Sequence, residues 1–352
     1  MSLTDVSYYV RKYMPFAIIG ILGVFIFFYM IRLLLLIGST PQQAQVYLDP
    51  IFQKIKAPVY REASPSAYPQ QFSLDTIEGK PVTATDSAQV FYLPAATTNL
   101  GFRDKIYLMA KAFGFSSDTK HVLNGTDATF ADGKQTLSID VTNFNFTYRY
   151  EASLEASMFS SLGQVPTETQ AAQRASDFLT AIDRYPQELS QGKTQIIYFA
   201  YAPQNNSLRV VDTPQMANVV EVDFYRPDVN DSGNGTIVSP LYFNSQNFVV
   251  LTVNNDQTHV IKAQVRFFEK SNDQVGVYPI RTGDDAWNQL KGGKAHIVFM
   301  AQNQNAVTIK KMYMAYMDPD IYQSYLQPVY VFMGTEGFVA YVPAVSDAYL
   351  LP

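Results

Sequence analysis

The sequence predicts an α+β protein in which one apolar helix near the amino terminus precedes a large body of helices and antiparallel strands. Three observations carry this prediction. The run from Met14 to Ile31 has no charged residue. Further along, amphipathic helical stretches are followed by short strand-like stretches, and this helix-then-strands order recurs. Such an order is typical of helices packed on one face of an antiparallel sheet.

The apolar run is long enough to predict a membrane anchor at residues 13–38. Residues 14–38 are interrupted only by Arg32, and a bilayer core of about 30 Å needs about 20 apolar residues in a helix. A cleaved signal peptide has a shorter apolar region that ends at small residues, so we expect an uncleaved helix after a short cytoplasmic tail, residues 1–12. Arg32 either extends its charge to the interface or pairs with a partner's membrane helix.

Composition favours a body outside the cytoplasm, with the amino terminus inside. The chain has no cysteine, and only 16% of its residues are charged, against about 25% in typical proteins. The lack of cysteine also fits a reducing interior. The net charge of −5 and the absence of any basic run argue against nucleic acid as a partner. A membrane and another envelope protein are the expected partners.

Three regions follow the predicted anchor. Residues 39–70 contain Pro58, Pro65 and Pro69 among small polar residues, which predicts an extended stalk. Residues 71–160 form a first predicted domain, with an amphipathic helix at 99–115. Turns at Asn124-Gly125 and Asp132-Gly133 separate its strands. The predicted strands cover residues 88–94, 121–123, 127–130, 136–141 and 143–150.

Residues 161–352 form a second predicted domain with the same order. A helix is expected from Pro166 to about Leu189, and a third helix at 284–290 with Thr282 as its cap. The strands after the first of these helices are expected at residues 195–202, 207–212, 218–225, 247–253 and 259–269. The closing strands are expected at 294–301, 306–316 and 328–342.

The closing part of the chain carries a resemblance. It reads AWNQL at 286–290, IKKMYMAY at 309–316, LQPVYVF at 326–332 and VAYVPAV at 339–345. This ending is similar to that of the YycH/YycI group, which are membrane-anchored regulators of a sensor histidine kinase. The overall plan resembles PepSY-like domains of bacterial envelope proteins. The resemblance implies a non-enzymatic extracytoplasmic module without catalytic residues or cofactors.

The residues themselves offer little catalytic chemistry. Without cysteine, thiol nucleophiles and thiolate metal sites are excluded. His121, His259 and His296 are far apart at starts of predicted strands, and the sequence has no nucleophile elbow or phosphate-binding glycine loop. Asp318 and Asp320 predict a turn and a helix start. We therefore expect no enzymatic activity, although an unrecognised hydrolase stays an alternative.

One polar loop has the first half of a calcium-binding pattern. Asp228, Asn230 and Ser232 occupy its first, third and fifth positions and Gly233 its sixth, but Ser239 stands where a glutamate is needed. A long polar turn between strands is the competing interpretation.

A tyrosine-rich stretch is the candidate partner surface. It comprises Tyr313, Tyr316, Tyr322, Tyr325 and Tyr330. Exposed tyrosine rows serve in interfaces, whereas buried ones form ordinary sheet core. The predicted function is protein–protein contact in regulation or assembly of an envelope complex, and binding of a cell-wall polysaccharide is the alternative.

Overall fold

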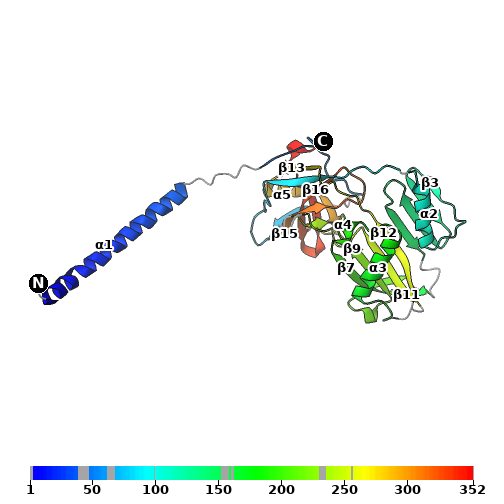
Figure 1. Ribbon diagram of the computed structural model, residues 1–352, viewed down its shortest axis with the longest axis horizontal. Helices are drawn as coiled ribbons and strands as arrows, with labels where there is room; N and C mark the ends of the chain where they lie inside the picture. Colours follow the sequence, from blue (N-terminus) through cyan, green and yellow to red (C-terminus); the bar gives the residue numbers. More distant parts are fainter. Residues whose placement is uncertain are drawn as a thin grey trace. The chain divides into compact units, whose positions relative to one another are not determined.

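The computed structural model describes residues 3–38, 47–61, 68–98, 100–151, 158–159, 162–229, 235–254 and 257–351. The chain divides into two compact units, Met1–Tyr47 and Leu48–Pro352. The first contains α1 (Leu3–Gly38), so most of the predicted tail is helical (Figure 1). Its apolar side chains from Phe16 to Leu34 are exposed wherever they are described. Among the described residues, no helix combines the length and apolarity that a membrane crossing requires. The predicted transmembrane helix is therefore not confirmed.

Part of the predicted stalk belongs to the second unit. Asp49 forms an antiparallel bridge with Val277, and Ile55 forms a parallel bridge with Leu350. The Ile55 side chain is buried. Residues 39–46 and 62–67 lie outside the described residues, so only 47–61 and 68–70 can be placed. The packing of residues such as Ile55 could not be predicted from the sequence, because the residues they contact lie more than two hundred positions away.

A nine-stranded antiparallel sheet contains two helix-and-meander units side by side. Its order is β3-β4-β5-β6-β12-β11-β9-β7-β8. The first unit is α2 (Phe102–Ala112) with β3 (Val122–Asn124), β4 (Asp127–Ala131), β5 (Gln135–Asp140) and β6 (Phe146–Tyr150). The second is α3 (Glu168–Ala181) and α4 (Gln187–Ser190) with β7 (Thr194–Ala202), β8 (Ser207–Val211), β9 (Val219–Phe224), β11 (Phe248–Asn254) and β12 (Gln257–Val265). The recurring order is confirmed, and β6 pairs with β12 to join the units into one sheet.

The long helix predicted from Pro166 to Leu189 is wrong in its second half. Thr167 and Gln170 form a capping box at the start of α3, as the sequence pattern allows. The helix ends because Asp183 takes a positive φ of 53°, and Pro186 disfavours the helical conformation in the residue before it. A short α4 follows this break.

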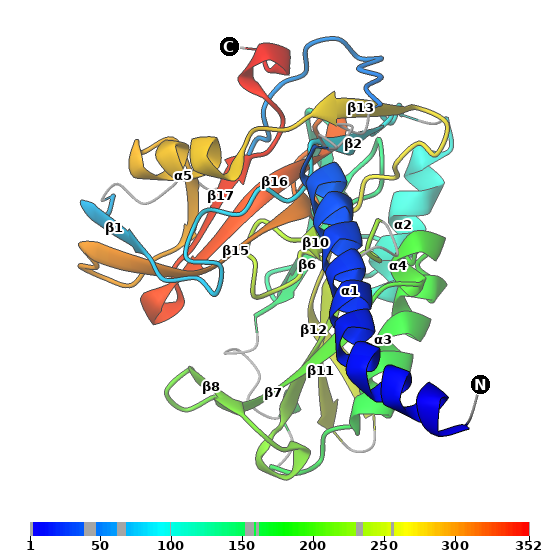
Figure 2. The ribbon, with the colours of Figure 1, turned by 90° about the vertical axis from the view of Figure 1, so that its left-hand side faces the viewer.

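Both α2 and α3 pack on the same face of the nine-stranded sheet. Their buried side chains, among them Ile106, Met109, Ala175 and Leu179, share one core with alternate residues of the strands. Figure 2 shows the two helices on one side of β11 and β12. The opposite face of the sheet carries neither helix.

A second sheet of eight strands is built around β15 (Ala306–Met317) and β16 (Tyr325–Gly334). Its other strands are β1 (Gln71–Leu74), β2 (Ser87–Tyr92), β10 (Ile237–Val238), β13 (Val275–Pro279), β14 (His296–Phe299) and β17 (Val339–Pro343). Most pairs are antiparallel, but β1 and β10 each pair with β15 in parallel. The helix α5 (Gly283–Lys291) packs on this sheet and is capped by Thr282, as predicted. Short 3₁₀ helices lie at Pro214–Met216, Thr335–Gly337 and Asp347–Tyr349.

A buried arginine links the two sheets. Arg226 follows β9 and has no exposed side-chain surface. Its Nε donates to Asp318 Oδ1 at 3.0 Å, its Nη1 to Glu188 Oε2 at 2.9 Å and its Nη2 to the Phe268 carbonyl at 2.6 Å. Asp318, predicted only as a turn residue, is thus a buried ion-pair partner. Burial raises its pKa to about 6, although the Arg226 charge opposes the shift.

Candidate functional site

The helix-free face of the nine-stranded sheet is the surface on which functional side chains gather. Side chains alternate between the two faces of a strand, so on β9 Val220 and Val222 join the helix-covered core while Val219, Glu221 and Asp223 point to the other side. We call this second side the open face. It has an apolar end and a polar end.

The apolar end is a groove of about 340 Å³ on β7, β9, β11 and β12. A small cluster on this face contains no residue of α2 or α3. Its members are Val219, Phe248 and Val250, with Phe159, Phe199, Tyr201 and Ile261 packed against them. The rings of Phe159 and Tyr201 lie 4.6 Å apart. A second hollow of about 610 Å³ shares these two aromatic residues.

The groove ends at the edge strand β8, which among the described strands has a neighbour on one side only. Leu208 lines the groove and is 58% exposed, and Val210 on the same strand is also exposed. An edge strand leaves one row of backbone groups able to pair with another chain, and Arg209 is the single charged residue of β8. The apolar end therefore has the properties of a contact surface.

Two carboxyl groups lie on β9 at the apolar end, and Glu221 lines the groove. Asp223 is buried, and its Oδ2 accepts from the Ser245 backbone N–H at 3.1 Å and from the Tyr225 hydroxyl at 3.4 Å. Burial raises the pKa of Asp223 to about 7, and the charge of Glu221 adds to the shift. Burial also raises the pKa of Glu221, against the opposing charge of Lys262. Burial and the neighbouring carboxyl group thus both favour the protonated form of Asp223.

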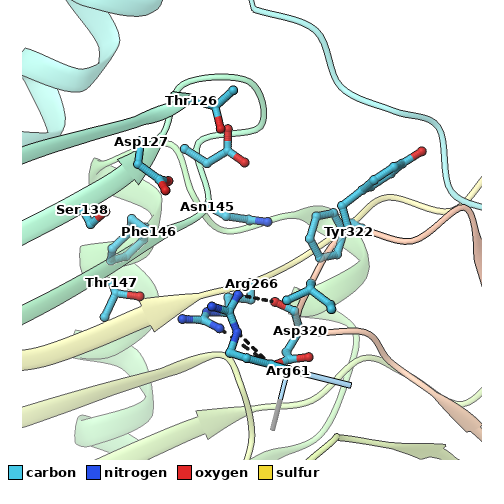
Figure 3. Close-up of a pocket in the computed structure, with 13 residues that line it drawn as sticks. Arg61, Thr126, Asp127, Ser138, Asn145, Phe146, Thr147, Arg266, Asp320 and Tyr322 are labelled. Atoms are coloured by element: carbon cyan, nitrogen blue, oxygen red, sulfur yellow. Dashed lines mark hydrogen bonds and ion pairs between the residues drawn. The ribbon is translucent and has the colours of Figure 1, made fainter. Parts of the chain in front are cut away.

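The polar end is a pocket of about 300 Å³, drawn in Figure 3, where β4, β5 and β6 meet residues around Arg61 and Asp320. Arg61 Nε lies 3.3 Å from Asp320 Oδ2, and Arg266 Nη1 lies 3.8 Å from the same oxygen. Burial lowers the pKa of Arg266, and the Arg61 charge adds to this effect. Two guanidinium groups thus share one carboxylate at this end of the pocket.

Asn145 supplies a further donor to the pocket. Its Oδ1 accepts from Arg184 Nη2 at 2.7 Å and from the Phe267 backbone N–H at 3.0 Å. The side-chain Nδ2 is buried and has no hydrogen-bond partner in the described part of the chain. Buried polar atoms without a partner are uncommon and require an explanation.

The tyrosine-rich surface predicted from the sequence does not exist as one exposed surface. Tyr316 and Tyr330 are buried, because β15 and β16 are the central strands of the eight-stranded sheet. Tyr313 is half-buried, with its hydroxyl 3.1 Å from that of Tyr242, and Tyr325 packs on Phe52 at 5.0 Å between ring centroids. Only Tyr322, at 44%, is exposed, and it lines the polar pocket.

The remaining candidate residues are scattered. Arg32 lies on α1 and is exposed, and its pairing with a partner helix stays a prediction. Asp228 Oδ1 accepts from the Ile237 backbone N–H at 3.2 Å, while Asn230 and Ser232 lie outside the described residues. Among the residues that are described, no three acidic or histidine side chains are grouped as metal ligands. The calcium loop stays a prediction.

The three histidines do not form a common site. His296 stacks on Tyr60 with ring centroids 3.7 Å apart, and burial lowers its pKa to about 4, so it is neutral at physiological pH. His121 Nδ1 lies 3.1 Å from the Tyr107 hydroxyl, and His259 lies within β12. They occupy three different places in the fold, as expected for isolated histidines near strand ends.

Comparison with known proteins assigns no family. No family model matches the chain, and no curated protein matches it. Among solved structures, the Bacillus megaterium YpeB C-terminal domain is similar with a TM-score of 0.27 and 12% identity, over 72% of this chain and 95% of that one. An uncharacterized protein from Eubacterium rectale is similar with a TM-score of 0.30 and 13% identity, over 80% and 90%. Similarities at these TM-scores do not establish a common fold.

Sequence reasoning missed the open face, although one signal for its apolar end was present. The β7 sequence TQIIYFAYA places apolar residues on both faces of the strand, which is unusual for a sheet with one solvated face. The pocket had no such signal, since Arg61 and Asp320 are 259 residues apart.

Proposed function

We propose that this protein is a non-catalytic, extracytoplasmic binding module that acts by protein–protein contact. The observation that carries the proposal is the apolar groove on the open face, which ends at the unpaired edge of β8. Exposed apolar patches of this kind mark interaction sites. A fold related to PepSY-like domains is part of the proposal, supported by the recurrence of a helix followed by an antiparallel meander.

A protein partner suits the groove better than a polysaccharide. Sugar-binding surfaces need aromatic rings together with many polar groups that bind hydroxyls. The groove has aromatic and aliphatic side chains in equal number: Tyr150, Phe159, Phe199 and Tyr201, and Leu208, Val219, Val250 and Ile261. Its charged residues, Arg149, Glu151, Glu221 and Lys262, are mixed in sign. The aromatic side chains and Arg149 are of residue types that are enriched at protein interfaces.

The proposal includes location at a membrane, with the amino terminus in the cytoplasm and the body outside. The exposure of apolar side chains along α1 supports it. The proposed span is residues 13–38, and the side chains of residues 35–38 lie outside the described ones. Another protein in the envelope, either regulated by this one or assembled with it, is the proposed partner, and Arg32 would face that partner's helices.

Single cysteines test this location, because the chain has none of its own. We expect a membrane-impermeant maleimide to label Glu78→Cys, in an exposed turn of the body, in intact cells. Ser2→Cys should react only after the cells are broken. Labelling of Ser2→Cys but not Glu78→Cys in intact cells would show the opposite orientation. Release of the protein from membranes by alkaline carbonate would contradict the proposed membrane anchor.

A pair of exposed leucines tests the contact surface. Leu208 borders the groove at 58% exposure, and Leu108 on α2 is equally exposed at 57% on the opposite side of the sheet. We expect Leu208→Glu to weaken the partner's binding about tenfold or more, since burying a leucine is worth about 1.5–3 kcal/mol. Leu108→Glu should bind as the unaltered protein does.

The measurement is quantitative co-purification of the full-length protein from its own membranes in mild detergent. Equal recovery of the partner with both variants would contradict the assignment of the groove. Recovery of cell-wall glycan in place of protein, lost in Leu208→Glu, would favour the polysaccharide alternative.

A further inference from the structure

The polar pocket at the other end of the open face has donors that the fold does not use. The Arg266 guanidinium makes no hydrogen bond to any described residue, and its ion pair with Asp320 is long at 3.8 Å. Asn145 is only 8% exposed, and its Nδ2 has no partner. Figure 3 shows this amide group extending into the space between the strands and Tyr322. A buried amide donor beside a guanidinium that makes only a long ion pair favours an anionic oxygen ligand.

The charge at this end matches a ligand group with one negative charge. Arg61 and Arg266 carry two positive charges, and Asp320 neutralises one of them. Arg61 is half exposed, and to turn toward a ligand its guanidinium has to leave its hydrogen bonds to the Asp320 carboxylate and backbone carbonyl. A carboxylate bound by two guanidinium groups is a common and strong arrangement.

The opposite side of the pocket is acidic. Asp127 on β4 and Asp140 on β5 are direct cross-strand partners, and both line the pocket. Like charges that face each other across a sheet are unfavourable. Asp140 accepts hydrogen bonds from Thr142 and Asn143, whereas the Asp127 carboxylate has no hydrogen bond to a described residue. Arg266 already interacts with the Asp127 charge across the pocket, and a cationic group placed directly beside Asp127 would offset the remaining repulsion.

We propose that the pocket binds a small zwitterion, namely a free amino acid or a short peptide with both termini free. The ligand's carboxylate lies at Arg266 and Asn145, and its ammonium group lies at Asp127. The volume of about 300 Å³ suits a ligand of this size. The hydroxyl groups of Ser138 and Thr147 also line the pocket and can bind a peptide group between the two charges.

The charge pattern separates this ligand from two simpler ones. A bare divalent cation would lie near Arg61 and Arg266, whose charges repel it, and no group of metal ligands occurs among the described residues. A bare anion such as phosphate would be repelled by Asp127 and Asp140. A molecule with separated positive and negative charges satisfies both sides. This inference is independent of the proposed contact surface, because Leu208 lies in the groove and not in this pocket.

Calorimetric titration of the full-length protein in detergent tests the proposal. The probes are alanine, glutamate, lysine and the dipeptide Ala-Ala, with N-acetyl-Ala-Ala and Ala-Ala amide as blocked forms. We expect saturable binding of Ala-Ala at one site, with affinity about tenfold lower for each blocked form, because each loses one charge-assisted contact. The absence of saturable binding by every unblocked probe at millimolar concentration would overturn the proposal.

Two variants assign the ends of the ligand. In Arg266→Gln, Ala-Ala and its amide should bind equally weakly, because the carboxylate no longer finds its partner. In Asp127→Asn, Ala-Ala and its acetylated form should bind equally.

Two control variants, Arg103→Gln and Asp118→Asn, remove exposed charges elsewhere and should leave binding unchanged. Asp127 is exposed, so its variant should fold normally, as thermal unfolding will check. If both variants still bound Ala-Ala more tightly than its blocked forms, the assignment of the ligand's ends would be overturned.

Discussion

Replacing Arg226 with methionine is expected to lower the free energy of unfolding by about 3–5 kcal/mol, the usual cost of removing one partner from a buried ion pair. The variant leaves Asp318 buried without its cation. Glu188 is less affected, because Lys270 Nζ lies 3.1 Å from its Oε1. The Phe268 carbonyl also loses its donor. These contacts join α4 and the ends of β9, β12 and β15, so the variant should loosen the connection between the two sheets.

The loss in Arg226→Met should depend on pH. Burial raises the pKa of Asp318 to about 6, above its ordinary value of 3.8, so between these values the folded protein binds a proton that the unfolded chain does not. This contribution to stability increases as pH falls through about 6. The Arg226 charge lowers this pKa, so in the variant Asp318 binds its proton at a higher pH than in the unaltered protein. The loss of unfolding free energy in the variant should therefore be smaller at acidic than at alkaline pH.

Urea unfolding at about pH 8 and about pH 5 measures this difference. A second variant, Arg226→Met with Asp318→Leu, removes both partners and should recover part of the lost stability, since apolar replacements of buried pairs are often neutral. Unchanged stability in Arg226→Met at both pH values would contradict the role given to the buried arginine.

Gly192→Ala is expected to destabilise the protein by about 1–3 kcal/mol or more, the range for overpacked positions. A Cβ atom at Gly192 would overlap the backbone carbonyl of Tyr225, which cannot move aside as a flexible side chain could. Gly192 follows α4, and the next residue, Lys193, accepts a hydrogen bond from the Tyr225 backbone N–H at 2.9 Å. The close approach of these two backbones is what positions α4 beside β9.

Thermal or urea unfolding compares this variant with Gly101→Ala. Gly101 precedes α2 at a φ of −87°, with nothing near the position of a Cβ. Its replacement should cost at most about 1 kcal/mol, as for a weaker helix cap. Equal stability of the two variants would show that the approach at Gly192 is not close.

Local features of the fold were predictable from the sequence because they depend on neighbouring residues. The capping box of Thr167 and Gln170 and the cap at Thr282 follow from short spacings. The turn between β3 and β4 has Gly125 as its first loop residue, with a positive φ that glycine adopts without strain. The strands of both meanders could likewise be found from their alternation of apolar residues.

The tertiary arrangement was not predictable, because it rests on pairings between distant segments. β1 pairs with β15 across more than two hundred residues, and no local pattern encodes a parallel pair. The burial of Tyr316 and Tyr330 depends on which strands become central in the sheet. The polar pocket likewise combines Arg61, Asn145 and Asp320, which carry no shared motif.

The most direct test of the contact surface is photo-crosslinking in native membranes. A photoreactive phenylalanine is placed at position 208, beside the groove, or at position 108 on α2, where the exposure of the side chain is matched. The account predicts one discrete crosslinked protein from position 208 and none from position 108. Crosslinking from position 108 alone, or the same products from both positions, would contradict the claim that the open face is where this protein meets its partner.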